Sequence, residues 1–407
     1  MKILFLNQFY YPDVAATAQQ MSDLAEHLVE RGHTVHVLCS RGQYDDGSGQ
    51  PTPKKETHKG VWIRRLSAPG FGKKSTIGRI IDYVGFHLLA GLWLLLFGWR
   101  YHTIVTLTTP PLIGTYATLL KWFSFGKVKH VCWSMDLHPD CEFELGVCSR
   151  KNPFFMFLDF LNGLHFRQAH ATVALGDCMK QRLLDKRVKE EKLHVIGVWN
   201  RADQVTPIPL GQSPLRSSQG FDDKFVVMYS GNAGLIHTFD AVCEAMKQLN
   251  DDNAIHFVFI GGGKRLLQIE EFAKENNLSN FTKLPYFPRE QLSQSLAMGD
   301  VHLVTMRQGM QGVAVPCKLY GIMAAARPAI FVGPPDADTA IQINAANAGY
   351  VIDINDAQTL VEKIKSLAAS PETADQLGQS GREYFLQHHE KEVCCTQWTN
   401  LLESLVK

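Results

Sequence analysis

Short apolar runs and amphipathic stretches alternate along the chain. Residues 1–6 form an apolar run of strand length, residues 19–31 carry apolar side chains at helical spacing, and residues 34–39 form a second apolar run. Gly32 follows the helical stretch, where a helix commonly ends. A strand, a helix and a strand in this order predict a βαβ unit. Further strand-like runs, separated by helical stretches, occur at residues 61–66, 103–108, 129–133, 171–174 and 194–198.

A second series begins after a stretch rich in Pro, Ser and Gly at residues 206–220. Both series have the alternation of a parallel sheet that is covered by helices on both faces. The predicted fold class is therefore α/β, with two Rossmann-like doubly wound parallel-sheet domains. We expect the domains at residues 1–205 and 206–385, and a C-terminal helix at 386–407 that could cross back to the first domain. The second series predicts strands at 225–230, 255–261, 281–284, 301–305 and 329–332, with helices at 238–249, 265–276, 290–298 and 318–325.

Length and composition support two large cores. The chain has 407 residues, 45% hydrophobic and 20% charged, and a single core stops growing at roughly 250–300 residues. The composition is that of a globular protein and excludes disordered, collagen-like and coiled-coil chains. The net charge is +1, but residues 1–200 carry +7 and residues 201–407 carry −6. The basic half could face an anionic surface, or the difference could be ordinary surface variation.

Two further features suggest a cytoplasmic protein. The nine cysteines form neither a CxxC pair nor a spacing typical of metal ligands, so we expect reduced thiols. The N-terminal run turns polar at Asn7, before it reaches the length of a signal peptide. Because no basic run is interleaved with aromatic residues, we do not expect a nucleic acid partner.

Residues 80–99 form a long apolar stretch in which Asp82 and His87 are the only acidic, basic or imidazole side chains. About 20 apolar residues can span a bilayer. However, the strand expected at residues 103–108 follows at once, and a single span would divide the first sheet between two sides of a membrane. We therefore do not expect a transmembrane helix.

Two interpretations of residues 80–99 remain open. The helix could be fully buried in the first core, or it could lie partly in a membrane interface with Trp93 and Trp99 as anchors. Residues 121–127 and 152–167 add aromatic surface in the same basic half. They favour a membrane-facing first domain and peripheral association with the inner face of the cytoplasmic membrane.

Three loops of the second series carry glycines beside a cationic or imidazole side chain. Gly231 opens a loop that reaches His237, residues 261–263 are three glycines followed by Lys264, and Lys318 begins a predicted helix after a glycine-containing loop. Ligands of doubly wound sheets bind outside the carboxyl ends of the strands. Helix N-termini and cations bind anions there. The loops predict a nucleoside diphosphate site, although Lys318 could instead be a solvated lysine and His237 a helix cap.

Several segments resemble the donor-binding domain of glycosyltransferase family 4: YSGNAGLIHTFDAV, FIGGGKRLLQIEEFA, FTKLPYFPREQLSQSLAMGDVHLV and VPCKLYGIMAAARPAIFVG. The first βαβ unit of that family is similar to NQFYYPDVAATAQQMSDLAEHLVERGHTVHVL, and its mid-domain signature to WSMDLHPD. The resemblance covers nearly the whole chain. It implies the GT-B fold, in which two Rossmann-like domains face a central cleft. It also implies retaining, hexosyltransferase-type transfer that needs no metal or other cofactor.

The resemblance implies particular donor-binding residues. Lys318 and the backbone around it would hold the diphosphate and ribose, His237 would line the phosphate side, and Phe287 to Arg289 would border the base. The full expected set is Ala16, Thr17, Asn232, Gly234, His237, Gly263, Lys264, Phe287, Arg289, Arg307, Gly309, Val315, Lys318, Leu319 and Tyr320.

The sequence also departs from the family pattern. Val313 and Gly321 stand where many members have two glutamates eight residues apart, so the usual carboxylate beside the sugar is missing. Residues 15–16 are alanines where many members have paired glycines, and residues 135–136 are Met-Asp where many have His-Asp.

These departures leave Asp136 as the best carboxylate candidate in the cleft, with His138 and Asp140 beside it. The predicted catalytic residues are Asp136, His138 and Lys318. Lys318 would stabilise the leaving phosphate, and Asp136 would act on the acceptor or on the developing sugar cation. Alternatively, Asp136 only braces the fold.

The function expected is transfer of a sugar from a nucleoside-diphosphate sugar, with UDP the first choice, to a lipid-linked or polysaccharide acceptor at the membrane. A GT-B sugar-nucleotide epimerase is the alternative enzyme, but it would need carboxylates that positions 313 and 321 lack. A nicotinamide-dependent dehydrogenase should have GxGxxG after its first strand, and NQFYYPDVAATA stands there instead. A non-catalytic scaffold that docks on membranes is the remaining alternative.

Overall fold

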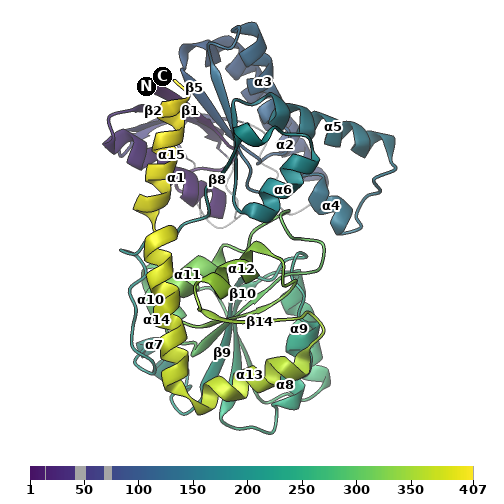
Figure 1. The fold of residues 1–407 in the computed structure, drawn as a ribbon, viewed down its shortest axis with the longest axis vertical. Coiled ribbons are helices and arrows are strands. Elements are labelled where there is room, and N and C mark those ends of the chain that lie inside the picture. The colour runs from purple at the N-terminus through teal and green to yellow at the C-terminus, as the bar shows by residue number, and fades with distance from the viewer. Residues whose placement is uncertain (14, 42–51, 68–75, 407) are drawn as a thin grey trace. The chain divides into compact units, whose positions relative to one another are not determined.

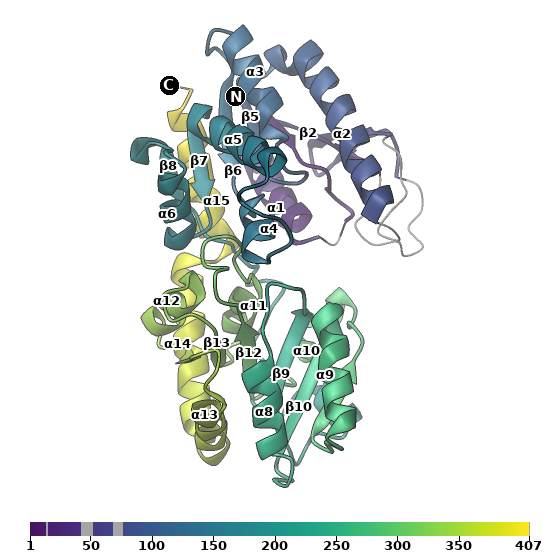
Figure 2. The same ribbon diagram turned by 90° about the vertical axis from the view of Figure 1, so that its right-hand side faces the viewer.

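The computed structural model describes residues 1–13, 15–41, 52–67 and 76–406, which form two compact units (Figures 1 and 2). The first unit ends at residue 197, eight residues before the expected domain boundary, and the chain returns to it at residue 394. The reason lies in Asn200, whose backbone exchanges hydrogen bonds with His389 and Lys391 of the second unit. Unit 1 comprises Met1–Gly197, Gly312–Ala314 and Cys394–Lys407, and unit 2 comprises Val198–Gln311 and Val315–Val393.

Unit 1 contains an eight-stranded sheet in the order β3-β4-β2-β1-β5-β6-β7-β8. All neighbours are parallel except β3 and β4. The sequence did not predict β3, because its KETH segment is polar and forms an exposed edge hairpin rather than an apolar run. The strands are β1 (Lys2–Leu6), β2 (Thr34–Ser40), β3 (Lys55–His58), β4 (Val61–Leu66), β5 (Thr103–Leu107), β6 (Lys129–Trp133), β7 (Ala171–Ala174) and β8 (Leu193–Val195).

Helices of unit 1 cover this sheet, and α15 from the C-terminal end of the chain packs into it. Trp398 of α15 lies 4.6 Å from Trp133 at the end of β6, measured between ring centroids. The side chain of His33 hydrogen-bonds Glu403 of α15, so the end of the chain lies beside its beginning (Figure 1). The helices are α1 (Ala16–Glu30), α2 (Thr76–Phe97), α3 (Gly114–Phe123), α4 (Asp140–Glu144), α5 (Pro153–Gln168), α6 (Asp177–Asp185) and α15 (Lys391–Ser404), with 3-10 turns η2 (Gly98–Arg100) and η3 (Glu190–Lys192).

Helix α2 has one buried face and one exposed apolar face. Phe86, Ala90 and Leu94 are fully buried, and they pack on the core formed with β1, β5 and α3. The opposite face exposes Leu88 and Leu92 to 64% and 59%. The helix is therefore not fully buried. This excludes the interpretation in which residues 80–99 lie wholly within the first core. By length and composition, Ile81–Arg100 is one stretch able to cross a membrane, with mean hydropathy 1.6 and 33% of it buried.

Unit 2 contains a six-stranded parallel sheet in the order β11-β10-β9-β12-β13-β14. Numbered within the unit, this is the 3-2-1-4-5-6 order of a Rossmann fold, with its switch point between β9 and β12. The short GYVI strand β14 was not expected from the sequence. The strands are β9 (Phe225–Asn232), β10 (Ile255–Gly262), β11 (Phe281–Leu284), β12 (Val301–Thr305), β13 (Ala329–Val332) and β14 (Gly349–Ile352).

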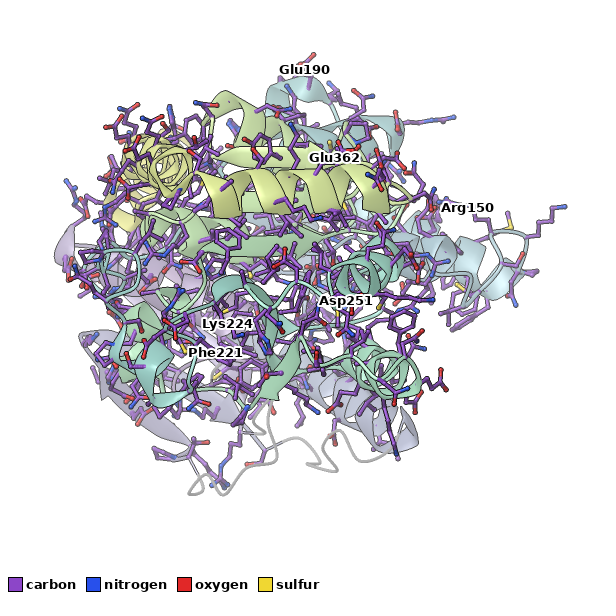
Figure 3. The ribbon with its side chains drawn as sticks, turned by 90° about the horizontal axis from the view of Figure 1, so that it is seen from below. Arg150, Glu190, Phe221, Lys224, Asp251 and Glu362 are labelled. Carbon is purple, nitrogen blue, oxygen red and sulfur yellow. The ribbon has the colours of Figure 1, made fainter. Side chains whose placement is uncertain are left out.

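The helices of unit 2 are amphipathic and bury their apolar faces on the sheet. In α13, Leu360 and Ile364 are fully buried, whereas Glu362 is exposed on the outer side of the helix (Figure 3). The elements are α7 (Pro214–Ser218), α8 (Asp240–Gln248), α9 (Lys264–Glu275), η4 (Arg289–Gln291), α10 (Leu292–Leu296), α11 (Lys318–Ala324), α12 (Asp338–Ala345), α13 (Ala357–Ala369) and α14 (Pro371–His388).

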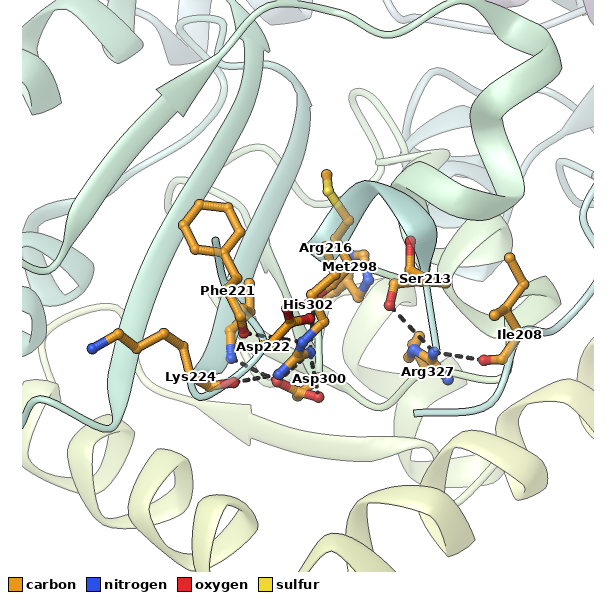
Figure 4. A network of polar contacts seen from close by, with 12 residues as sticks. Ile208, Ser213, Arg216, Phe221, Asp222, Lys224, Met298, Asp300, His302 and Arg327 are labelled. Carbon is orange, nitrogen blue, oxygen red and sulfur yellow. Dashed lines mark hydrogen bonds and ion pairs between the residues drawn. The ribbon is translucent and has the colours of Figure 1, made fainter. Parts of the chain in front are cut away.

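A buried ion pair closes the amino edge of the unit 2 sheet (Figure 4). Arg216 Nη1 lies 2.9 Å from both carboxylate oxygens of Asp300, which directly precedes β12. Asp300 Oδ2 also accepts from the backbone N–H of Val226 at 2.7 Å. Arg327 donates to the carbonyl of Ile208 at 2.7 Å. These contacts fix the segment before β9 against the sheet.

Candidate active site

The carboxyl ends of β9 and β10 approach each other closely in unit 2, and glycines make this possible. A side chain at Gly261, whose φ is +120°, would lie 2.6 Å from the carbonyl oxygen of Gly231. A side chain at Gly263, whose φ is +116°, would lie 2.4 Å from the carbonyl oxygen of Ala233. The Gly-rich motifs therefore form a backbone surface that carries no side chains and can approach a ligand.

Lys318, the first residue of α11, reaches the end of β9. Its ammonium donates a short hydrogen bond to Tyr229 Oη and lies 4.0 Å from the centre of the Tyr229 ring. Its Nζ is 3.5 Å from His237 Nε2. Lys318 and His237 were predicted to share one site, and the structure brings them together.

The orientation of His237 follows from its second nitrogen. Its Nδ1 lies 2.6 Å from the carbonyl oxygen of Thr305 at the end of β12, so Nδ1 carries the proton and donates. The lone pair of Nε2 then faces Lys318. Burial, together with the nearby lysine, lowers the pKa of His237 to about 3, so the imidazole is neutral at physiological pH.

The partners of Lys318 are thus all uncharged. Burial lowers the pKa of Lys318 to about 7. No ion pair joins Lys318 to a carboxylate in the part of the chain that the structure describes. A cation held among neutral groups, at the switch point of a doubly wound sheet, is an arrangement that suits an anionic ligand.

The other residues expected around the donor fall into three groups. The backbone of Arg307 donates to the carbonyl of Ile236 at 2.8 Å, which ties the loops after β9 and β12 together. Leu319 and Tyr320 have buried side chains, so only their backbone can border a ligand. Exposed or partly exposed positions on these loops are Asn232, Gly234, Gly263, Lys264, Gly309 and Val315.

Phe287 and Arg289 were expected to border the base, but their side chains have other partners. Phe287 packs against the core cluster that contains Phe221. Arg289 donates to Gln204 Oε1 at 2.8 Å. The aromatic ring beside the end of β10 belongs to Tyr286, which is 60% exposed and would lie 2.8 Å from a side chain at Gly261. Tyr286 was not among the residues expected from the sequence.

In unit 1, Asp136 and His138 follow the carboxyl end of β6. The backbone N–H of Asp136 donates to Thr108 Oγ1 at 3.1 Å. His138 Nδ1 lies 2.8 Å from Glu142 Oε1. Burial opposes the charged form of His138, but the hydrogen bond and charge of Glu142 outweigh it and raise the pKa of His138. Sequence reasoning missed Glu142, although its i, i+4 spacing from His138 was a signal.

Among the residues that the structure describes, the Asp136 carboxylate has no ion pair. Burial raises its pKa, and the nearby His138 partly opposes this rise. Asp140, by contrast, lies 2.7 Å from Lys186, which also contacts Asp159 at 2.6 Å. Asp140 is therefore committed to a structural ion pair.

Two more predicted residues lie at the start of α1 in unit 1. Ala16 and Thr17 are its first residues and are at least partly exposed. The preceding Ala15 donates its backbone N–H to Asp13 Oδ1 at 2.9 Å, which shapes the loop after β1. This loop lies at the unit 1 switch point, between β1 and β5.

The described residues include no group of three or more His, Cys, Asp or Glu side chains placed to hold a metal ion. The cations and imidazoles described above are donors and acceptors of hydrogen bonds. Their arrangement suits an anionic ligand.

Two doubly wound α/β units are the domain composition of the GT-B glycosyltransferase fold, and a buried cation at the end of β9 suits the donor domain of that class. Family models agree. Residues 16–199 match the glycosyl transferase 4-like domain, and residues 212–384 match glycosyl transferases group 1. The chain therefore belongs to the glycosyltransferases in which a 4-like domain is followed by a group 1 domain.

Individual relatives are glycosyltransferases by name. The chain is 27% identical to WbjE of Pseudomonas aeruginosa over 66% of each chain. It is 24% identical to WcaI of Escherichia coli, named for colanic acid biosynthesis, over 80% of this chain and 81% of WcaI. Sucrose-phosphate synthase of Thermosynechococcus elongatus has the same fold, with a TM-score of 0.77 and 17% identity over 100% and 99% of the two chains. HepE of Anabaena, solved in complex with UDP, also has this fold, with a TM-score of 0.73 and 14% identity over 99% of this chain and 100% of HepE.

Proposed function

We propose that this glycosyltransferase transfers a sugar, with retention of configuration, from a UDP-sugar to a lipid-linked or polysaccharide acceptor at the membrane. The proposal rests on the Lys318 ammonium, which contacts Tyr229 and His237 and has no carboxylate partner among the described residues. The choice of UDP is supported by HepE, which was solved in complex with UDP. The acceptor class is supported by WcaI, which is named for colanic acid biosynthesis.

Lys318 would stabilise the leaving diphosphate. When the bond between the sugar and the phosphate breaks, negative charge grows on the phosphate oxygen, and a cation already in place there lowers the barrier. His237 faces the same position, and Thr305 holds its ring. The glycine surface of β9 and β10 lets the diphosphate approach the backbone.

Retention in this proposal comes from departure and attack on the same face of the sugar. The leaving phosphate oxygen would take the acceptor proton, and so no strong enzymic base is required. Asp136 would steady the developing positive charge or orient the acceptor hydroxyl, with His138 as a hydrogen-bond donor. Positions 313 and 321 carry no carboxylate, which leaves Asp136 as the main candidate for this role.

The reaction is proposed to need no divalent metal or other cofactor. Lys318 supplies at the diphosphate the positive charge that a metal ion supplies in other phosphate-binding enzymes. Treatment with EDTA should leave the initial rate unchanged. A rate that EDTA abolishes and Mg²⁺ or Mn²⁺ restores would contradict metal independence.

The proposed membrane contact uses the outer faces of three helices of unit 1. α3 packs against both α2 and α5, so the three helices form one layer (Figure 2). Of the 24 large apolar side chains exposed in the described residues, 15 lie on this layer or the turns after it, a concentration typical of an interaction surface. These 15 are Ile81, Val84, Leu88, Leu89, Leu92, Leu95, Leu96, Trp99, Trp122, Phe123, Phe125, Phe154, Met156, Phe157 and Phe160.

Cations accompany these apolar faces. Arg100 lies 5.2 Å from the ring centre of Trp99, in the turn η2 that follows α2. Arg167 lies 5.9 Å from that of Phe160 on α5. Aromatic and basic residues together suit the headgroup region of an anionic bilayer. The protein would then work on the inner face of the cytoplasmic membrane, where a lipid-linked acceptor is within reach.

A thermal-shift panel of nucleoside diphosphates tests the donor assignment. A ligand at 100 times its dissociation constant stabilises a protein by about 2.7 kcal/mol, so UDP should raise the melting temperature by several degrees. Lys318→Ala should abolish the shift. The matched control, Lys274→Ala, replaces an exposed lysine of α9 and should keep it. If no nucleoside diphosphate shifts the wild-type protein, the donor assignment fails.

Flotation with liposomes tests the membrane contact. The wild-type protein should float with anionic vesicles, more at low than at high salt. The double variant Leu88→Glu/Leu92→Glu places charges on the exposed face of α2 and should stay in solution. A control double variant, Leu267→Glu/Ile341→Glu, alters exposed apolar residues of unit 2 and should float. Equal behaviour of the two variants would rule out this face.

A further inference from the structure

Tyr229 holds Lys318 in place before any ligand arrives. Its hydroxyl accepts from the Lys318 ammonium, and its ring face lies under the same charge. The hydroxyl donates its own proton to the carbonyl of Asn232 at 3.1 Å. Because that proton is committed, the oxygen presents a lone pair to Lys318.

The Tyr229 ring is itself fixed by its neighbours. It stacks on Phe259 at 5.7 Å between ring centroids and meets Phe239 edge to face at 5.0 Å. Tyr229 is 1% exposed. The position of its hydroxyl is therefore set by the core rather than by solvent.

We propose that Tyr229 is a positioning residue for Lys318 and that a nucleoside diphosphate binds together with one proton, which the Lys318 amine takes up. This inference rests on the proposed function, because it concerns the same donor site. Without ligand, the described residues offer the ammonium only neutral partners. A bound diphosphate supplies the missing negative charge and so favours the charged lysine.

The proton balance is simple. The free protein near pH 8 holds the lysine mainly as the neutral amine, since burial lowers its pKa to about 7. On binding, a buffer acid gives one proton to Lys318 Nζ, and the amine becomes the ammonium that faces the diphosphate. No bond of the ligand breaks in this step.

The two groups that contact the Lys318 amine, Tyr229 and His237, do not titrate in this range. Burial raises the pKa of Tyr229 far above its ordinary value and lowers that of His237 to about 3. The thiol of Cys317 precedes Lys318 in the chain, and Tyr286 faces Tyr229. Cys317→Ser serves as the control for the thiol.

Isothermal titration of the full-length protein with UDP, in buffers of different ionisation enthalpy, counts the protons. In the ligand-free protein the pKa of Lys318 is about 7. We therefore expect uptake close to one proton per UDP at about pH 8 and close to none below about pH 6. Lys318→Arg keeps a cation that does not lose its proton. This variant should bind UDP with no uptake, and its signal corrects for the proton of UDP itself.

Tyr229→Phe keeps the ring but removes the oxygen. Loss of a hydrogen bond to a charged group should lower the pH of half-maximal uptake by about one unit. UDP affinity should then fall up to about tenfold at pH 8 and little at pH 6. A merely structural role would weaken binding equally at both pH values.

The outcomes separate the inference from the proposed function. If no nucleoside diphosphate binds the wild-type protein, the proposed function fails and this inference falls with it. If UDP binds without uptake, or if uptake persists in Lys318→Arg, the inference alone is overturned. An unchanged pH profile in Tyr229→Phe removes the positioning role of Tyr229.

Discussion

Buried cations at the two edges of the unit 2 sheet, where the strands begin and where they end, have different kinds of partner. At the amino edge, Arg216 is matched by Asp300 and by backbone carbonyls, so both its charge and its hydrogen-bond donors are satisfied (Figure 4). At the carboxyl edge, Lys318 has Tyr229 and His237, which provide lone pairs but no charge. The sheet is the same, and only the partners differ.

This difference separates a cation that serves folding from one that serves a ligand. Burying a charge costs free energy unless another charge or several hydrogen bonds compensate. Arg216 is compensated within the protein, so its burial is complete without a ligand. The partners of Lys318 compensate only part of the cost of burying its charge. A bound anion would compensate the rest, and this gain would stabilise the complex. Variants at the two edges should therefore have opposite effects on stability and on binding.

The largest expected effect is on the folding side. Asp300→Ala leaves the Arg216 guanidinium buried without its carboxylate, and breaking such a pair costs about 3–5 kcal/mol. Thermal unfolding should show a strongly lowered melting temperature for this variant, with UDP affinity unchanged in the molecules that remain folded. Asp222→Ala, which removes only an exposed hydrogen bond to Ser217, is the control and should change little. A stable Asp300→Ala protein would remove the contrast between the edges.

The next effect is on the ligand side. Lys318→Ala should lose on the order of 2–4 kcal/mol of transition-state stabilisation, measured as kcat/KM for transfer or for donor hydrolysis. Its ligand-free stability should not fall. The folded pKa of Lys318, about 7, lies below the ordinary lysine value, so the unfolded chain binds the extra proton between these pH values. The charged lysine thus destabilises the fold at low pH.

Lys318→Met sharpens this point because it keeps the length of the side chain. The variant should melt at a higher temperature than the wild type at pH 6.5. The gain should shrink as the pH rises through the range from about 7 to about 10.4, the ordinary lysine pKa. A variant that melts lower than the wild type at pH 6.5 would mean that Lys318 serves folding, like Arg216.

The sequence predicted the edge at which each group lies better than it predicted the contacts there. Apolar runs marked both parallel sheets, but β3 is polar and β14 is short, and neither produced a clear pattern. The domain boundary was placed late because the backbone pairing of Asn200 with His389 joins residues far apart in the sequence.

The candidate site shows the same limit. Glycines and Lys318 could be recognised from their spacing, because backbone approach and a helix start follow from local sequence. Tyr286 and Tyr229 could not, since their roles depend on which ring turns toward Gly261 and which hydroxyl reaches Lys318. Such orientations are decided by core packing on the other side of each residue.

A further prediction extends the comparison to unit 1, where Asp136 has no ion pair with any of the described residues. By the same reasoning it should serve the reaction rather than the fold. Asp136→Asn should leave stability and UDP binding nearly intact and lower the transfer rate by about 10²-fold or more. Full turnover together with a lowered melting temperature would make Asp136 a bracing residue.

The smallest expected effect concerns His138 and Glu142. Their place in the sheet resembles that of Lys318, and their paired charges resemble those of Arg216 and Asp300. This pair lies at the carboxyl end of a strand, yet the charge of its histidine is matched within the protein. Because Glu142 raises the folded pKa of His138 above its ordinary value, the pair stabilises the fold fully below about pH 6.5. This contribution is lost as the pH rises through the folded pKa.

Glu142→Gln should therefore lower the unfolding free energy by about 0.5–1 kcal/mol near pH 5.5, since the pair is partly exposed to solvent, and by almost nothing near pH 9. Melting curves at these two pH values measure the effect. The pH–rate profile of the same variant then assigns the role of the pair. If protonated His138 assists transfer, the alkaline fall of the rate should move to lower pH, because the histidine now loses its proton earlier. An unmoved profile with a pH-dependent loss of stability would place His138 with Arg216, among the cations that serve folding.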